Sequence, residues 1–194
     1  FTDWKIEISV CAGGTIRFGH VSTISAELLA LTEAVPDACD RYGYEGYMFD
    51  SCSWRQIDVP VSAGDFLGTL GGLDTPNTAL DFWAYDWDGD LHFAIDPSAQ
   101  PEGILRSQCA LDWFVDDLRT EFYAQRMEFG GIRADEGIGC GKVFQDVVGA
   151  AKGFWYSTVE VGGKWLDHLA LVDDNVRSDH QVVSVASMLA NPGY

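Results

Sequence analysis

The stretch "IDVPVSAGDFLGTLGG", residues 57 to 72, decides the class of fold expected for this chain. Gly64 and Asp65 stand between two short runs rich in Val, Ile and Leu, and a glycine pair, Gly71 and Gly72, closes the second run. A Gly-Asp pair between apolar runs is typical of a tight turn joining two strands. The segment therefore predicts strand, turn and strand in a mainly β protein.

Similar patterns occur on both sides of this segment. Residues 4–10 and 15–21 are β-branched or alternating runs separated by "CAGG", which predicts a hairpin. Further strands are expected at residues 79–85, 91–95, 142–148, 153–160, 165–172 and 181–186.

Two segments have helical rather than strand periodicity. Residues 25–34 begin with Ser25, a good N-cap, carry Glu27 in the first turn and stop before Pro36. Residues 109–127 place apolar side chains at three-to-five-residue spacing, which predicts one long amphipathic helix with its apolar stripe in the core. The predicted fold class is mainly β with two helices.

The composition limits the classes of partner that the chain could bind. It has thirty acidic and twelve basic residues, and the formal net charge of −18 would repel the phosphates of nucleic acids. No apolar run reaches the ~20 residues that a membrane-spanning helix needs. We therefore expect no nucleic-acid partner and no membrane span, and the acidic surface suits a secreted protein.

The chain has five cysteines and no Cys-x-x-Cys pair, which favours disulfides over a zinc knuckle. Cys39 and Cys52 bracket a Tyr- and Gly-rich loop, and Cys109 and Cys140 bracket the long helical segment. Two bridges are predicted, and with them an oxidising, extracellular compartment. Cys11 is left either for a partner outside these residues or as a buried thiol.

Two motifs in residues 15–72 resemble the lysostaphin-like zinc endopeptidases, whose β-sheet fold is called the duplicated hybrid motif. In that family a strand ending in Tyr-Ala-His-Leu precedes a Val-x-x-Gly-(Asp or Gln)-x-(Ile or Leu)-Gly turn and a Gly-rich loop. The first motif is matched by Phe18, Gly19, His20 and Val21, and the second by Val61, Gly64, Asp65, Leu67, Gly68, Gly71 and Gly72. The resemblance covers about residues 4–96.

The resemblance implies a β-sandwich core of the duplicated-hybrid-motif type over residues 1–100. It also implies that the fold's opening strands and the family's upstream His-x-x-x-Asp ligands are missing, as in a piece of a longer precursor. Residues 101–194 match no peptidase element and are expected to form a helix plus a β-rich extension, packed on the core as one compact unit.

The family's third motif, His-Leu-His-Phe, aligns here in two ways. By spacing from the Gly64 turn it falls on "ALDF", which puts Ala79 and Asp81 in place of the histidines; by residue identity it falls on "DLHFAI", which replaces the first with Asp90 and keeps His92. The spacing alignment is preferred because strand length and turn geometry resist change more than single polar residues do.

The resemblance makes His20 a vestigial catalytic residue, and makes Asp81 or His92 a metal ligand if zinc is bound at all. Independently, Asp86, Asp88 and Asp90 in "DWDGD" offer the oxygen ligands that calcium prefers, although the full calcium loop is absent. No cofactor is expected to be essential, and zinc and calcium are the two ions considered. No Gly-x-Ser-x-Gly elbow supports a serine hydrolase.

Aromatic side chains crowd the cysteine-bracketed loop and its end. Flat rings with acidic neighbours suit stacking against sugar rings or a protein partner. The candidate binding residues are Tyr42, Tyr44, Tyr47 and Trp54.

Together these features predict a secreted, non-catalytic protein that acts in binding or assembly at a cell surface or in an extracellular matrix. Its partner would be a protein, a cell-wall or glycan surface, a second copy, or a segment that completes the sheet beside residues 4–10. The alternative is an active zinc endopeptidase of cell-wall peptides whose remaining ligands lie upstream of Phe1. The prediction for enzymatic activity leans towards none.

Overall fold

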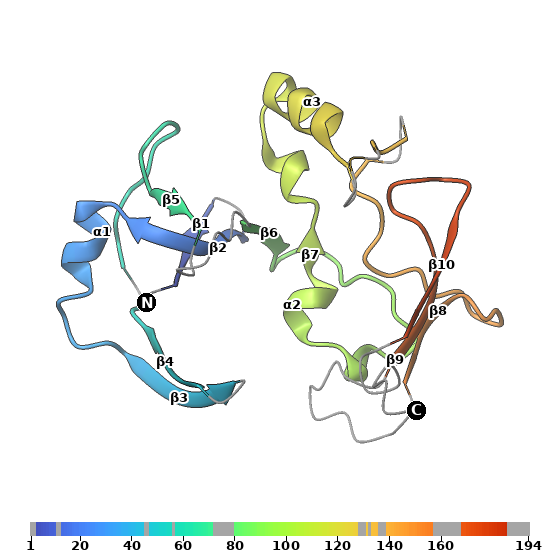
Figure 1. Ribbon diagram of the computed structural model, residues 1–194, viewed down its shortest axis with the longest axis horizontal. Coiled ribbons are helices and arrows are strands. Elements are labelled where there is room, and N and C mark those ends of the chain that lie inside the picture. The colour runs from blue at the N-terminus through green and yellow to red at the C-terminus, as the bar shows by residue number, and fades with distance from the viewer. Residues whose placement is uncertain are drawn as a thin grey trace. The chain divides into compact units, whose positions relative to one another are not determined.

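A computed structural model describes residues 3–10, 13–44, 47–55, 57–71, 80–127, 131, 133–135, 139–156 and 168–185 (Figure 1). The fold is mainly β with few helices, as predicted. The chain contacts divide into two compact units, one of Phe1–Ile6 with Arg17–Asp81 and one of Glu7–Ile16 with Phe82–Tyr194. The boundary expected at residue 100 lies within the second of these units.

The predicted N-terminal hairpin is present as β1 (Trp4–Ser9) and β2 (Gly14–Ile24). These strands begin the sheet path β1-β2-β6-β7, and β5 (Gly68–Leu70) pairs antiparallel with β2. Along β1, half-buried and exposed residues alternate, as expected for a strand with one face towards a core.

The first predicted helix is confirmed as α1 (Ala26–Leu31). Ser25 is its N-cap, and the hydroxyl oxygen of Ser25 accepts a hydrogen bond from the backbone N–H of Leu28 at 3.2 Å. This bond satisfies one of the N–H groups that a helix start leaves without a partner.

The segment between Cys39 and Cys52 is a hairpin, so the prediction of a loop was wrong. Strands β3 (Ala38–Tyr44) and β4 (Tyr47–Ser53) pair antiparallel, with Cys39 directly opposite Cys52. The predicted disulfide joins these two residues, whose Cα atoms lie 4.0 Å apart. The Tyr residues that suggested a loop are compatible with a strand, because aromatic residues favour strands.

In residues 57–72 only part of the prediction holds. The turn exists, because the N–H of Asp65 donates to the carbonyl of Ser62 and the Asp65 carboxylate accepts from the N–H of Ser62. After the turn, β5 forms as expected, whereas residues 57–61 form no strand. The carboxylate of a turn residue thus closes the turn locally, without a second strand to hold it.

Except for its first residue, β6 (Asp81–Asp86) belongs to the second unit, which also contains the 3₁₀-helix η1 (Pro97–Ala99), α2 (Glu102–Leu105) and β7 (Ser107–Gln108). Of these four elements, β6 is the one that was predicted as a strand. Its residue Tyr85 is 2% exposed and stacks on Trp87, with ring centroids 5.6 Å apart. A Cβ atom at Gly103 would lie 3.4 Å from the Tyr85 ring, which is an ordinary van der Waals distance, so α2 packs beside this core.

The single long helix expected over residues 109–127 was wrong. The structure has a 3₁₀-helix, η2 (Ala110–Trp113), and then α3 (Asp116–Gln125), separated by extended backbone at Phe114 and Val115. This break places the Phe114 ring between Phe82 and Phe122, at centroid distances of 5.6 and 4.8 Å. No residue of α3 is fully buried, so the apolar stripe expected in the core is only partly covered.

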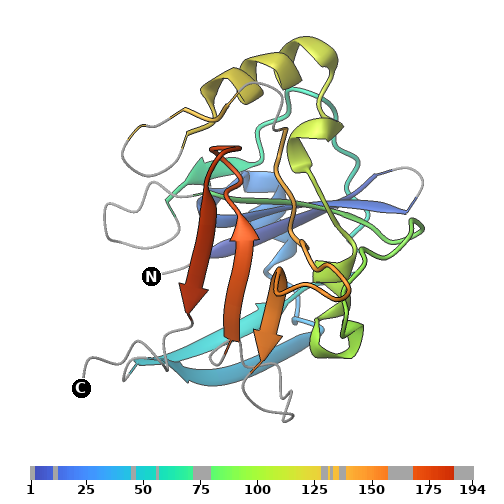
Figure 2. The same ribbon diagram turned by 90° about the vertical axis from the view of Figure 1, so that its right-hand side faces the viewer.

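The last sheet consists of β8 (Gly153–Tyr156), β9 (His168–Asp173) and β10 (Gln181–Val185), in the order β10-β9-β8. Figure 2 shows these antiparallel strands side by side in orange and red. All three were expected from the sequence, at slightly different boundaries.

Two other expected strands do not form. In residues 91–95, the N–H of His92 donates to the carbonyl of Leu105, and the N–H of Ile95 donates to the carboxylate of Asp146. In residues 142–148, the N–H of Lys142 donates to the side chain of Asn175. Tertiary hydrogen bonds to loops and side chains have replaced the strand ladder in both segments.

Candidate functional site

The backbone around His20 departs from a regular strand. His20 has a φ of 56°, and among the described residues it is the one non-glycine residue with positive φ. One step later, between Val21 and Thr23, the pairing of β2 with β5 contains an irregularity that leaves Ser22 as an extra residue. The Ser22 hydroxyl hydrogen-bonds the carbonyls of Thr69 and Leu70, at 3.1 and 2.9 Å, and so fixes this bulge.

The imidazole of His20 lies between two carboxylates. Its Nδ1 is 2.8 Å from Oδ2 of Asp3, and its Nε2 is 3.5 Å from Oδ2 of Asp81. A Cβ atom at residue 19 would lie 3.0 Å from the Cβ of Asp81, so Gly19 leaves room for that carboxylate. Both ring nitrogens can donate at once only when the imidazole is protonated.

This geometry gives His20 two anionic partners, one at each ring nitrogen. A metal ion binds one ring nitrogen along its lone pair, and the two carboxylates face different nitrogens. One ion therefore cannot be bound by the imidazole and both carboxylates together. Among the described residues no three His, Cys, Asp or Glu side chains form a group that could hold a metal ion.

The family's third motif aligned in two ways, by spacing on Asp81 and by residue identity on His92. The structure places Asp81, the residue that the spacing alignment selects, beside His20. Asp81 contacts His20, whereas His92 lies in the second unit, where its Nε2 contacts the carbonyl of Ser107. Ala79 lies outside the described residues.

The three aspartates considered for calcium do not converge. Oδ1 of Asp86 accepts hydrogen bonds from the backbone N–H groups of Asp88 and Gly89, at 3.1 and 2.8 Å, and so closes its own turn. Asp88 lies against Gly13, and Asp90 is exposed. The carboxylate of Asp86 thus has a structural use that needs no ion.

The first unit contains a cavity of about 380 Å³ beside β2 and β5. It is apolar, and three of the side chains that line it are substantially exposed: Phe66 at 65%, Leu70 at 56% and Leu80 at 38%. The other described lining residues are Ile6, Phe18, Val21, Gly64, Asp65, Leu67, Gly68 and Thr69. Sequence reasoning missed this cavity, although Phe66 beside a surface turn was a usable signal, because turn residues are mostly polar.

A second, more polar cavity of about 250 Å³ adjoins the first. Its described lining residues are Ser25, Glu27, Leu28, Val59, Pro60, Val61, Asp65, Phe66 and Leu67. Asp65, Phe66 and Leu67 line both cavities and so form a shared wall.

The aromatic candidates are only partly visible. The Trp54 indole N–H donates to the carbonyl of Ala34 at 2.8 Å, and its ring lies 6.4 Å from that of Trp4. Trp54 is therefore held within the first unit. Tyr42, Tyr44 and Tyr47 belong to β3 and β4 by their backbones, and their side chains lie outside what the structure describes.

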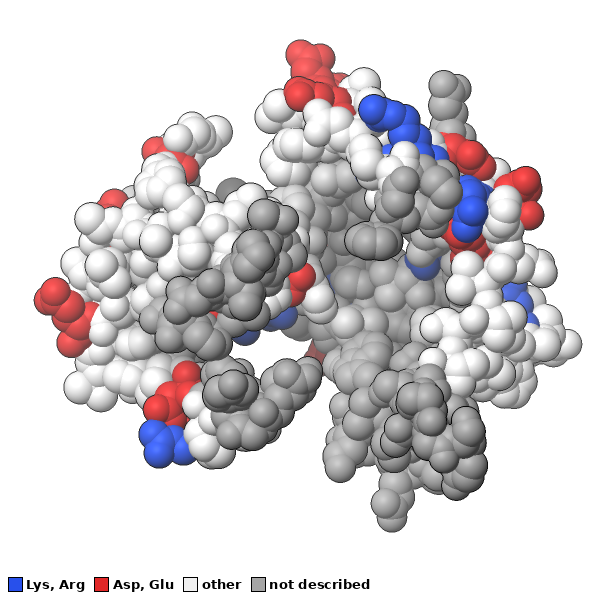
Figure 3. Space-filling view, viewed as in Figure 1, with Lys and Arg blue, Asp and Glu red and all other residues white. Residues whose placement is uncertain are grey.

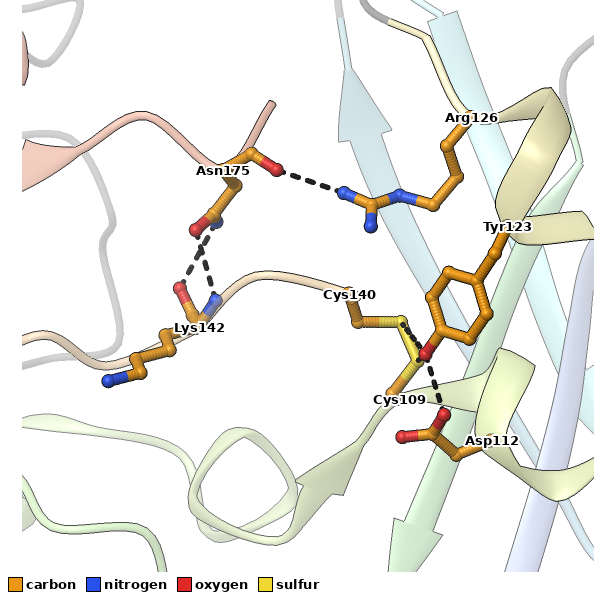
Figure 4. The surroundings of a disulfide bond; sticks show 7 residues. All are labelled: Cys109, Asp112, Tyr123, Arg126, Cys140, Lys142 and Asn175. Atoms are coloured by element: carbon orange, nitrogen blue, oxygen red, sulfur yellow. Dashed lines mark hydrogen bonds between the residues drawn. A yellow bond between two sulfur atoms is a disulfide. The ribbon is translucent and has the colours of Figure 1, made fainter. Parts of the chain in front are cut away.

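The second predicted disulfide, Cys109–Cys140, is present and lies beside Tyr123 (Figure 4). The Tyr123 hydroxyl donates to a carboxylate oxygen of Asp112 at 2.6 Å and contacts the sulfur of Cys109 at 3.1 Å. Partial burial and the bond to Asp112 raise the pKa of Tyr123 to about 12. The group is structural, because it joins η2, α3 and the segment at Cys140.

On the face shown in Figure 3, acidic side chains are scattered rather than gathered into one patch, and much of the described surface is uncharged.

Within the described residues, no helix is both long enough and apolar enough to cross a membrane. Comparison of the chain with known protein families, with curated proteins and with solved structures found no match.

Proposed function

We propose that this chain is a secreted, non-catalytic protein of the lysostaphin-like fold that acts in binding or assembly at a cell surface or in an extracellular matrix. The observation that carries the proposal is the apolar cavity beside β5, whose lining residues Phe66, Leu70 and Leu80 are exposed. Concave apolar surface of this size is typical of binding sites.

The two disulfides support an extracellular location. Cys39–Cys52 and Cys109–Cys140 are bonds that persist in oxidising compartments. The net charge of −18 is compatible with such a location, because it keeps a protein soluble at a surface.

The position of β1 supports an assembly role. Among the described strands, β1 stands at the end of the path β1-β2-β6-β7, so its outer side is where a further strand could add. The exposed positions of β1 include Lys5 and Glu7, and charges on an edge strand limit indiscriminate pairing.

The zinc-endopeptidase alternative is weakened by the surroundings of His20. In an active site of that class the histidine must assist a metal-bound water, whereas here each ring nitrogen faces a carboxylate. The alternative still makes a clear prediction: the full-length protein would contain stoichiometric zinc and would lose peptidase activity with a chelator.

The test uses the disulfide-bonded chain and Nile red, an uncharged dye whose fluorescence rises in apolar surroundings. We expect saturable binding, weakened about tenfold by Phe66→Ser, because the side chain removed supplies apolar contact area. Val148→Ser, a matched change at an exposed valine of the second unit, should leave binding unchanged. Absence of saturable binding, or equal effects of the two substitutions, would contradict the proposal.

A further inference from the structure

The two cavities of the first unit differ in chemistry while sharing a wall. The larger is lined by aliphatic and aromatic side chains, and of its described lining residues only Asp65 is ionisable. Two acidic residues, Glu27 and Asp65, line the smaller, and its described lining includes no basic residue. Asp65, Phe66 and Leu67 separate the two, so a ligand that crosses this wall meets an apolar and an acidic surface in succession.

From this arrangement we infer that the paired cavities bind a basic, apolar peptide segment, in which a hydrophobic side chain enters the larger cavity and an adjacent Arg or Lys reaches Glu27 and Asp65. The inference rests on the proposed binding function and names the class of partner. The occupant is a segment of another protein chain.

The carboxylate of Asp65 can serve the turn and the ligand together. One of its oxygens accepts the N–H of Ser62 at 2.7 Å, and an ionised carboxylate has about four lone-pair positions, so further donors can be accommodated. The turn therefore holds Asp65 in place at the shared wall before any ligand arrives. A group fixed in this way loses less entropy on binding.

Charge complementarity selects a basic occupant over the alternatives. A chain with a net charge of −18 attracts cationic segments and repels anionic ones at long range. An uncharged sugar would leave the two carboxylates without a charged partner, and an anionic lipid surface would be repelled by them. Apolar contact supplies the remaining binding free energy, as in other sites with a hydrophobic centre and a charged rim.

The test uses three terminally blocked peptides titrated into the disulfide-bonded chain by calorimetry: Gly-Arg-Leu-Leu-Arg-Gly, Gly-Glu-Leu-Leu-Glu-Gly and Gly-Arg-Ser-Ser-Arg-Gly. We expect the first to bind at least about tenfold more tightly than either of the others and to displace Nile red. Raising the salt concentration should weaken binding of the first peptide, because its Arg side chains would contact exposed carboxylates.

Substitutions at the two acidic residues test whether they bind the peptide. Glu27→Gln and Asp65→Asn each keep the side-chain shape and remove one charge, and each should lower the affinity for the first peptide about threefold or more. Asp117→Asn, an equal change of charge at an exposed position of α3, should not. Circular dichroism of each variant checks folding, and the two cavity variants are independent of each other.

The outcomes separate this inference from the function on which it rests. If Nile red binds but the Glu-containing peptide binds as well as the Arg-containing one, the basic-peptide inference is overturned and apolar binding stands. Tight binding of a chitin oligosaccharide or of anionic vesicles, with no response to the Arg-containing peptide, would also overturn it. If neither dye nor peptide binds, the proposed function itself fails.

Discussion

Asp81 lies beside His20, with its Oδ2 atom 3.5 Å from Nε2 of the imidazole, and Asp3 contacts the other ring nitrogen at 2.8 Å. The two carboxylates come from opposite ends of the first unit's chain, and His20 itself sits on backbone with positive φ. His20 thus combines a backbone conformation that most residues disfavour with two charged side-chain contacts. Substitutions can test the contribution of each to stability separately.

Substitutions at His20 should separate the backbone cost from the side-chain contacts. His20→Val should lower the free energy of unfolding by about 1–3 kcal/mol, because a β-branched residue is disfavoured at positive φ. His20→Asn should cost no more than about 1 kcal/mol, because Asn tolerates this conformation and only partly exposed ion pairs are lost. Urea unfolding measures the free energy of unfolding of both variants. Equal losses would show that the backbone conformation at residue 20 does not cause the destabilisation.

Zinc should have little effect on this chain. Each nitrogen of His20 faces a carboxylate, so treatment with a strong chelator should shift the melting temperature by less than about 1 °C. Addition of zinc should likewise leave the melting temperature of the unsubstituted chain, and that of Asp81→Asn, unchanged. A chelator-induced loss of stability that Asp81→Asn abolishes would show instead that Asp81 is a ligand.

The two disulfides should differ in their contribution to stability according to loop length. Cys39–Cys52 closes a loop of sequence separation 13 and Cys109–Cys140 one of 31. The chain-entropy relation gives about 3 and about 4 kcal/mol respectively. The paired variants Cys39→Ser with Cys52→Ser, and Cys109→Ser with Cys140→Ser, should follow that order in urea unfolding; the reverse order would mean that contacts near the sulfur atoms outweigh loop closure.

Stability at alkaline pH should depend on Tyr123. Burial first, and then the bond to Asp112, raises its pKa from the ordinary value of about 10 to about 12. The folded state therefore holds the phenol proton more tightly, and this stabilisation is complete below about pH 10 and disappears as the pH rises through about 12. Tyr123→Phe should have a flatter dependence of unfolding free energy on pH in that window, measured with short exposure to alkali.

Stability at acid pH should depend on Asp174. Its carboxylate accepts hydrogen bonds from the backbone N–H groups of Val176 and Arg177, at 2.6 and 3.0 Å, and these bonds lower its pKa below the usual value. A lowered pKa stabilises the folded state above about pH 4, and the stabilisation is lost as the pH falls through the folded-state value.

The matched variants are Asp174→Ala and Asp117→Ala. Asp174→Ala should lower the urea midpoint at neutral pH, and its difference from the unsubstituted chain should shrink as the pH falls below about 4. Asp117→Ala, at an exposed position of α3, should show no such convergence. A constant difference for Asp174→Ala at all pH values would mean that the carboxylate's charge is not involved.

The features predicted correctly are those that depend on local patterns. The hairpin β1–β2, the capped helix at Ser25 and the turn at Gly64 each depend on residues close together in the chain, where propensity and capping act directly. The disulfides followed from the number and spacing of the cysteines, although their pairing depended on how the intervening chain folds.

The secondary-structure predictions that were wrong failed because contacts between distant parts of the chain outweighed local preferences. The long helix breaks at Phe114 because the extended backbone there lets the ring pack between Phe82 and Phe122, a gain that no periodicity records. The expected strand at residues 91–95 is absent because its N–H groups find partners at Leu105 and Asp146 instead.

The sequence by itself determined a mainly β class, an acidic chain with two disulfides, and a turn at Gly64–Asp65, because composition and short-range backbone preferences suffice for these. Only the tertiary structure decided that Asp81 rather than His92 lies beside His20, and that Phe66 and Glu27 line two adjoining cavities. These groups are far apart in sequence, and their meeting depends on strand pairing and bulges, which set where each side chain is placed.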